Sequence, residues 1–235
     1  MVTRTCEAAF LHAARITLCF MCGIVGYVGP AGAGTSSRPS EVVLGGLSRL
    51  EYRGYDSAGI ARCGETGIEL FKASGKIQNL RDKLEGHESS KARAAIGHTR
   101  WATHGGPSDT NAHPHLGGKN GEVALVHNGI IENFAALKKE LADDGYEFLS
   151  DTDSEVVAHL LARECETAES LTEAMRACVA HLEGAFTLLA IHEDNPDVIV
   201  AARRNSPLVV GLGEGENFLG SDVAAFRSEE HTSEL

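Results

Sequence analysis

The alternation of apolar and polar positions predicts many strands and several helices. Residues 23–28 form a continuous apolar run bounded by glycine, which is typical of a buried strand. Apolar residues recur at helical spacing over residues 40–52, so we expect a helix there. By the same criteria, further strands are expected at residues 57–62, 68–74, 94–99, 122–126, 186–192, 197–202, 208–211 and 218–220.

Four more helices are expected at residues 77–84, 133–143, 154–165 and 170–182. Thr152 and Ser170 each precede a glutamate by three residues, Glu155 and Glu173, which is the spacing of a capping box at a helix start. Residues 102–120 form a long loop rich in Gly, Pro, His and Asn, and such loops are usually functional or disordered. The helices stand in blocks among the strands without regular alternation, which favours an α+β fold of mixed sheets with helices packed outside them.

Composition and charge exclude several classes of protein. The 235 residues suffice for one large domain or two small ones, and 43% hydrophobic with 23% charged residues is ordinary for a globular chain. The net charge of −12 argues against a nucleic-acid partner or an anionic membrane surface, both of which need basic charge. No apolar run approaches the roughly 18 residues of a membrane span.

The six cysteines indicate a reducing compartment, and we expect a cytoplasmic protein. The chain is much longer than disulfide-stapled scaffolds, and Cys165 and Cys178 fall in predicted helices. Cys19 and Cys22 form one C-x-x-C pair, but no second pair completes a zinc site and the histidines lack metal-ligand spacing. Two alternatives remain open: a redox-active or binding protein that uses this pair, and a secreted protein whose apolar run 16–28 is a signal sequence.

The segment Met21-Cys22 points to covalent chemistry. If translation began at Met21 and the methionine were removed, the chain would begin at Cys22 with a free α-amine beside its thiol. An α-amine has a pKa of about 7.7–8.0 and a thiol one of about 8.5, so near neutral pH the amine can take the thiol proton. An N-terminal residue can thus be both nucleophile and base. With residues 1–21 attached, that nitrogen is an amide and has no basicity.

Five ordered motifs resemble the glutaminase domain of the glutamine–fructose-6-phosphate aminotransferase (isomerising) family, also called glucosamine-6-phosphate synthases, which is a class II glutamine amidotransferase. The motifs are Cys22-Gly-Ile-Val-Gly26, Leu50-Glu-Tyr-Arg-Gly-Tyr-Asp-Ser-Ala-Gly59, His98-Thr-Arg-Trp-Ala-Thr-His-Gly105, Asn111-Ala-His-Pro-His115 and His127-Asn-Gly-Ile-Ile-Glu-Asn133. The resemblance covers about residues 22–226. It implies an N-terminal nucleophile hydrolase fold, a four-layer α/β/β/α sandwich.

The resemblance also implies a catalytic set. Cys22 would attack the side-chain amide of L-glutamine and form a thioester, with release of ammonia and then of glutamate. Asn128, through its side-chain amide, and Gly129, through its backbone N–H, match the oxyanion hole of the family. Taken alone, the Asn-Gly dipeptide would more often be a hairpin turn.

Six further positions match the substrate side of the family's site. Arg100 matches the residue that binds the α-carboxylate of glutamine, and Asp153 matches the one that holds its α-ammonium. Asp153 would also suit the first turn of a helix for purely structural reasons. The other expected residues would wall or cover the pocket, or position it: Trp101, Thr103, His104 and Arg53. We expect His113 and His115 to order the long loop.

Two departures from the family qualify these expectations. Residues 1–21 precede the expected mature start, so we expect them to be removed or to reflect a start assigned too early. Residues 227–235 follow the domain as a tail without an apolar pattern, expected to be disordered or foreign to the natural chain. The sugar isomerase region that binds fructose-6-phosphate does not follow, so this polypeptide would hydrolyse glutamine without aminating the sugar.

No metal, nucleotide or other cofactor is expected, because the chain lacks a phosphate-binding glycine motif. Two more alternatives stay open: a catalytically inactive fragment in which Cys22 is blocked, and the glutaminase of another class II amidotransferase.

Overall fold

The computed structural model describes residues 22–30, 38–64, 67–87, 92–101 and 106–226. The expected N-terminal extension, 1–21, and the expected tail, 227–235, lie outside these residues. Within the described ranges, no helix has the length and apolar character to cross a membrane.

Two antiparallel sheets form the centre of the molecule. The larger sheet has the order β3-β2-β4-β1-β10-β9. Its strands are β1 (Gly23–Val28), β2 (Ser57–Gly64), β3 (Gly67–Ser74), β4 (Ala94–Arg100), β9 (Val209–Leu212) and β10 (Asn217–Gly220). The smaller sheet has the order β5-β6-β7-β8. Its strands are β5 (His115–Gly117), β6 (Val123–Ile131), β7 (Gly184–His192) and β8 (Val200–Arg204).

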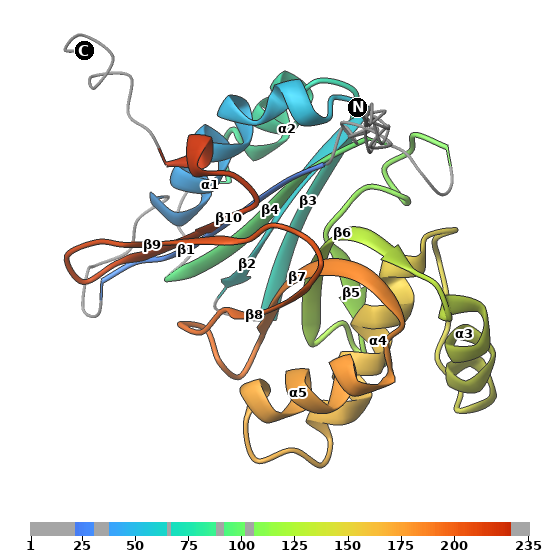
Figure 1. Ribbon diagram of the computed structural model, residues 1–235. Helices are drawn as coiled ribbons and strands as arrows, with labels where there is room; N and C mark the ends of the chain where they lie inside the picture. The colour runs from blue at the N-terminus through green and yellow to red at the C-terminus, as the bar shows by residue number, and fades with distance from the viewer. Residues whose placement is uncertain (1–21, 31–37, 65–66, 88–91, 102–105, 227–235) are drawn as a thin grey trace, which may run out of the picture.

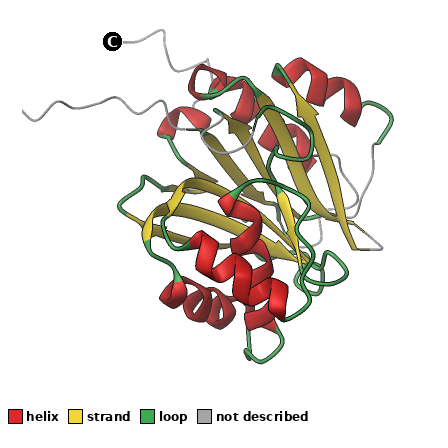
Figure 2. Ribbon diagram, turned by 90° about the vertical axis from the view of Figure 1, so that its right-hand side faces the viewer, coloured by secondary structure: helices red, strands yellow, loops and turns green. Residues whose placement is uncertain are grey.

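Helices cover the outer face of each sheet (Figures 1 and 2). The larger sheet carries α1 (Arg38–Arg49) and α2 (Ile77–Leu84), and the smaller carries α3 (Phe134–Asp143), α4 (Asp153–Cys165) and α5 (Leu171–His181). Two short 3-10 turns, η1 (Glu51–Arg53) and η2 (Val223–Ala225), complete the described elements. The expected four-layer α/β/β/α sandwich is confirmed.

Three apolar clusters hold the layers together. One lies between α1, α2 and the larger sheet, and another between the smaller sheet and α3, α4 and α5. The third joins the inner faces of the two sheets, with Ile24 and Ile96 of the larger sheet against Val126 and Leu189 of the smaller. Every second residue of β1 and β4 faces this middle layer, so polar residues at those positions are buried between the sheets.

The sequence placed the elements well but missed several boundaries, among them the strand expected at residues 197–202, which is β8 at Val200–Arg204. The predicted helix over 40–52 ends at Arg49 and continues only as η1. The expected loop 102–120 contains strand β5, and the strand expected to end at residue 126 continues to Ile131. That strand runs on because β7 pairs with it along its whole length, up to Ile131 opposite Gly184.

Both predicted helix caps are present. The Thr152 hydroxyl accepts a hydrogen bond from the Glu155 N–H, and the Ser170 hydroxyl accepts one from Glu173. Each satisfies a backbone donor that the first helical turn leaves unpaired. The cap on Thr152 fixes where α4 begins, and α4 begins at Asp153.

Candidate active site

Cys22 lies where the first strand of the larger sheet begins, beside the end of β4. The next residue, Gly23, pairs with Thr99, and its N–H donates to the Thr99 hydroxyl at 3.2 Å. The Cys22 Sγ accepts a hydrogen bond from the Trp101 N–H at 3.1 Å. A side chain at position 23 would collide with Thr99 and Leu50, so glycine is needed for this close approach.

The thiol is half-buried, and the net effect of its surroundings is to raise its pKa. Burial raises the pKa of the Cys22 thiol, and the nearby Asp56 carboxylate raises it further. Hydrogen bonds from the backbone of Trp101 and of Cys22 itself lower the pKa, as does the charge of Arg100.

Asn128 faces Cys22 from the other sheet. Its Nδ2 donates to the Cys22 carbonyl oxygen at 2.7 Å, and its Oδ1 lies 3.0 Å from His98 Nε2. The amide is buried, so both of its ends are committed to protein partners. Asn128 thereby connects β6 to the start of β1 at Cys22.

Gly129 follows in an exposed stretch of β6 with a φ of 128°, a conformation that favours glycine. A Cβ here would lie 2.0 Å from the Ala185 carbonyl oxygen of β7. The strand remains paired with β7 through Asn128 and Gly129. Position 129 requires glycine because its φ is positive and because a side chain there would collide with β7.

Arg100 and Asp153 are buried charged groups at the ends of two elements. Arg100 is the last residue of β4, and its Nη1 donates to the Gly106 carbonyl at 3.5 Å. Asp153 is the first residue of α4, and its Oδ2 accepts from the Ile131 N–H at 2.9 Å. Both side chains are no more than 5% exposed. The helix N-terminus favours the carboxylate, as expected from the sequence.

Trp101 reaches Cys22 through its backbone rather than its ring. The indole is 38% exposed and meets Tyr55 edge-on, with ring centroids 5.3 Å apart. The role of Trp101 as a wall of the substrate pocket stays a prediction. The predicted residues Thr103 and His104 lie outside the described residues.

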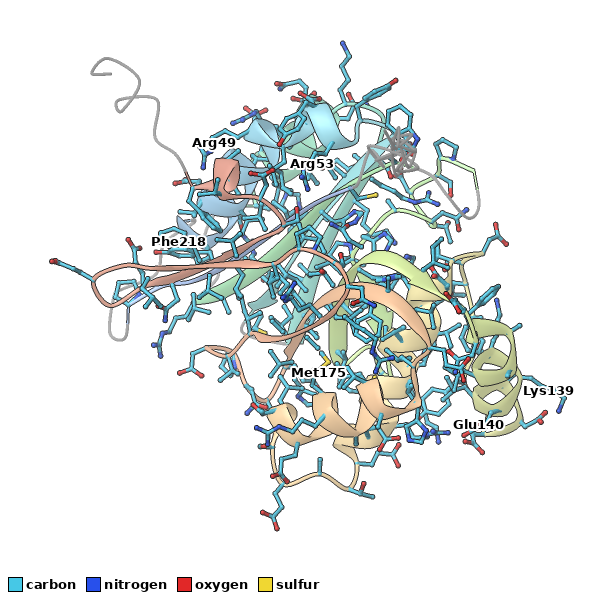
Figure 3. The ribbon with its side chains drawn as sticks, viewed as in Figure 1. Arg49, Arg53, Lys139, Glu140, Met175 and Phe218 are labelled. Atoms are coloured by element: carbon cyan, nitrogen blue, oxygen red, sulfur yellow. The ribbon has the colours of Figure 1, made fainter. Side chains whose placement is uncertain are left out.

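Arg53 contacts the last described segment of the chain. Arg53 is labelled in Figure 3. Its Nη2 forms an ion pair with Asp222 at 3.0 Å, and its Nη1 lies 3.5 Å from the Ser221 carbonyl. The Ser221 hydroxyl in turn accepts from the Ile24 N–H at 3.0 Å. Arg53 is therefore placed to position β1 through Ser221, and direct contact with a substrate stays a prediction.

Two residues that shape the site, His98 and Gly54, had no role predicted from the sequence. His98 begins one of the five motifs, yet only the structure shows that it contacts Asn128. Gly54 allows close packing, since a Cβ there would lie 2.6 Å from the backbone of Arg100. The alternation of β4 could have pointed to His98, because it shares the inner face of that strand with Ile96.

No group of three His, Cys, Asp or Glu side chains suited to hold a metal ion occurs among the described ranges. Cys22, Cys63, Cys165 and Cys178 are unpaired thiols.

The model of a glutamine amidotransferase domain matches residues 98–228 of the sequence. The chain belongs to the glutamine amidotransferase family. It is 62% identical over 206 residues to a glutamine–fructose-6-phosphate aminotransferase (isomerising) of Streptomyces coelicolor, covering 88% of this chain and 32% of the relative. It is 60% identical over 213 residues to the protein of that name from Leifsonia xyli, covering 90% and 33%.

Structural comparison supports the same fold. The amidotransferase domain superposes on the glutamine phosphoribosylpyrophosphate amidotransferase of B. subtilis with a TM-score of 0.72 and 27% identity, covering 87% of this chain and 43% of that one. The much higher identity to the fructose-6-phosphate aminotransferases confirms the narrower resemblance found in the motifs. The domain spans about a third of the length of those relatives.

Proposed function

We propose that the domain hydrolyses L-glutamine to glutamate and ammonia, as the ammonia-donating half of glucosamine-6-phosphate synthesis from fructose-6-phosphate. The observation that carries the proposal is the contact between Cys22 and the Asn128 amide, with Gly129 beside it. The Asn128 Nδ2 donates to the backbone carbonyl of the residue that bears the thiol, and Gly129 is the next residue of β6. This supports a site in which a nucleophile and two N–H donors act together, as hydrolysis of a side-chain amide needs.

The proposed nucleophile has a free α-amine, which requires a mature chain that begins at Cys22. The amine takes the thiol proton, and Sγ attacks Cδ of the glutamine side chain. The oxyanion so formed accepts from Asn128 Nδ2 and the Gly129 N–H. The protonated amine then passes its proton to the departing nitrogen, the C–N bond breaks, and ammonia leaves a thioester on Cys22.

Hydrolysis of the thioester completes the cycle. The α-amine takes a proton from water, the hydroxide adds to the thioester carbonyl, and the same donors hold the second oxyanion. The C–S bond breaks, glutamate leaves, and the thiolate recovers its proton from the amine. The net reaction consumes one glutamine and one water, and needs no metal or cofactor.

Arg100 and Asp153 are proposed to hold the amino-acid end of glutamine, through its α-carboxylate and α-ammonium respectively. Their burial and opposite charge support these roles. Trp101, with Thr103 and His104, is proposed to wall the pocket. The reaction is proposed to run in the cytoplasm, which the four unpaired thiols support. Fructose-6-phosphate would bind only a region that follows this domain in its relatives.

The test compares two preparations of the protein. One begins at Met21, so that removal of the methionine frees Cys22, and the other retains residues 1–21, with both N-termini verified by intact mass. We expect ammonia release and a single adduct with a glutamine-analogue electrophile only in the first. Cys22→Ala should abolish both, while Cys165→Ala, which changes another unpaired thiol, should change neither. Equal activity of the two preparations would overturn the proposed base.

A further inference from the structure

His98 occupies the middle layer directly behind the proposed oxyanion hole. It belongs to β4, where it stands opposite Ile24 of β1 and Gly59 of β2, and it is fully buried. Its side chain bridges the two sheets, since its Nε2 contacts Asn128 and the backbone of His127 on β6. None of the steps proposed above uses this imidazole.

The two contacts of Nε2 determine which hydrogens are present. Nε2 lies 3.1 Å from the His127 carbonyl oxygen, which can only accept, so Nε2 carries a hydrogen. The Asn128 atom 3.0 Å away must then be its oxygen. The amide nitrogen consequently points the other way, to Cys22. The orientation of the Asn128 amide therefore depends on which nitrogen of His98 carries the hydrogen.

Neighbouring groups keep the imidazole in that form. His113 stacks on His98 with ring centroids 4.2 Å apart and 27° between the rings. His98 Nδ1 is buried with no hydrogen-bond partner among the described residues, so a hydrogen on Nδ1 would be unsatisfied. Burial lowers the pKa of His98 to about 3, and the charges of His127 and Arg100 act in the same direction. The ring is neutral with its single hydrogen on Nε2.

Gly59 makes room for this stack. A Cβ at position 59 would lie 2.2 Å from the His113 carbonyl oxygen, so the segment carrying His113 can pack against β2 only above a glycine. Gly59 ends one of the motifs found in the sequence, and His113 lies in another. Gly59, His98 and His113, which come from three different motifs, therefore together support the orientation of the Asn128 amide.

We propose that His98 is a positioning residue that holds the Asn128 amide with its nitrogen toward Cys22, so that Asn128 is ready to donate to the oxyanion. The proposal rests on the function proposed above. Without the His98 donor, rotation of the amide by half a turn would present Oδ1 to the oxyanion and repel it. His98 itself touches neither substrate nor sulfur.

The test is a pair of substitutions that differ in one donor. His98→Gln keeps an N–H at the same number of bonds from the backbone, whereas His98→Leu removes it. In the active chain we expect His98→Leu to lower kcat by about 10²-fold with KM for glutamine nearly unchanged, and His98→Gln to recover most of the loss.

A ligand comparison separates positioning from general damage. The aldehyde analogue of glutamine adds to Cys22 and forms an oxyanion, whereas the product glutamate does not. His98→Leu should weaken aldehyde binding about as much as it lowers kcat and leave glutamate binding unchanged. Equal weakening of both ligands, or a His98→Gln protein as impaired as His98→Leu, would overturn the proposal.

A measurement on the unaltered 235-residue chain covers the case in which His98→Leu does not fold. Nitrogen-15 NMR of labelled histidine, with the His98 signal assigned through His98→Gln, should show the Nε2–H tautomer throughout pH 5.5–8. The opposite tautomer, or an imidazolium at pH 7, would refute the inference. If the chain that begins at Cys22 releases no ammonia, the proposed function fails, while the tautomer in the 235-residue chain still decides whether His98 orients Asn128.

Discussion

At the scale of single residues, Gly129 offers the sharpest test of the oxyanion hole. Its φ of 128° opposes any side chain, and so does the Ala185 carbonyl oxygen, which would lie 2.0 Å from a Cβ at this position. We expect Gly129→Ala to displace the backbone N–H and lower kcat for glutamine by about 10²-fold or more. Steady-state ammonia release measures this effect.

Gly145 provides the matched control. It also has a positive φ, of 89°, but nothing lies within 4 Å of a Cβ there. Gly145→Ala should therefore cost about 1–2 kcal/mol of stability with kcat unchanged. Similar kinetic losses in both variants would show that the activity responds to backbone strain in general and not to the Gly129 donor.

The sequence motifs suggested the residues proposed to act directly on glutamine, but they gave no role to His98, which is proposed to act through Asn128. Cys22 and the Asn128-Gly129 pair stand in recognisable motifs, and the structure brings them together. His98 stands in such a motif too, but its role depends on pairing between two sheets that are joined only in three dimensions. No local pattern specifies which atom a buried histidine will face.

At the scale of elements, the residue that caps α4, Thr152, directly precedes the proposed substrate ligand Asp153. The Thr152 hydroxyl caps the helix, and it also lies 3.0 Å from His115 Nε2. Asp153, the proposed ligand for the α-ammonium, is the next residue. We expect Thr152→Ala to cost about 1 kcal/mol of stability and also to raise KM for glutamine, because the carboxylate loses its fixed position.

Ser170→Ala supplies the comparison at the element scale. Ser170 caps α5 through the same kind of bond, to the Glu173 N–H, but α5 carries none of the proposed site residues. This variant should lose a similar free energy of unfolding, measured by urea denaturation, with KM unchanged. A rise in KM in both variants would mean that stability alone governs glutamine affinity.

The strand boundaries predicted from the sequence were wrong where pairing with a distant strand outweighs the local preference of the chain. The Asn128-Gly129 dipeptide favours a turn, yet β6 continues through it because β7 supplies a partner at each position. Likewise, β5 lies in a stretch without strand character and forms against β6 over three residues. Helix starts succeeded because caps are local: Thr152 and Ser170 hydrogen-bond within their own turn.

At the scale of the whole molecule, the four layers form one domain with Cys22 immediately before β1, and the chain spans about a third of the length of its relatives. We expect a polypeptide of residues 22–235, with Cys22 as its first residue, to release ammonia from glutamine and to form no glucosamine-6-phosphate when fructose-6-phosphate is added. Coupled detection of ammonia and of amino sugar checks both products. Amination of the sugar by this chain would contradict the prediction.

The middle layer should also make the whole fold sensitive to acid. Burial lowers the pKa of His98 to about 3 and holds the pKa values of His113 and His115 well below the usual 6.5, with neighbouring positive charges adding to the effect. Unfolding exposes these rings, so below about pH 6.5 the unfolded chain binds more protons than the folded one. Stability is therefore fully present above that pH and falls as the pH drops toward the folded-state values.

Replacing one of these histidines should lower by one the number of protons that the protein takes up when it unfolds in acid. His113 has no hydrogen-bond partner for either ring nitrogen among the described residues, so His113→Phe keeps a flat ring and removes only a titrating group. Between pH 6 and 5, each such histidine contributes a slope of about 1.4 kcal/mol per pH unit. Urea denaturation at a series of pH values should show the slope of His113→Phe reduced by about that amount relative to the unaltered protein. An unchanged slope in His113→Phe would mean that His113 is already protonated in the folded protein, and the neutral stack behind Asn128 would then be wrong.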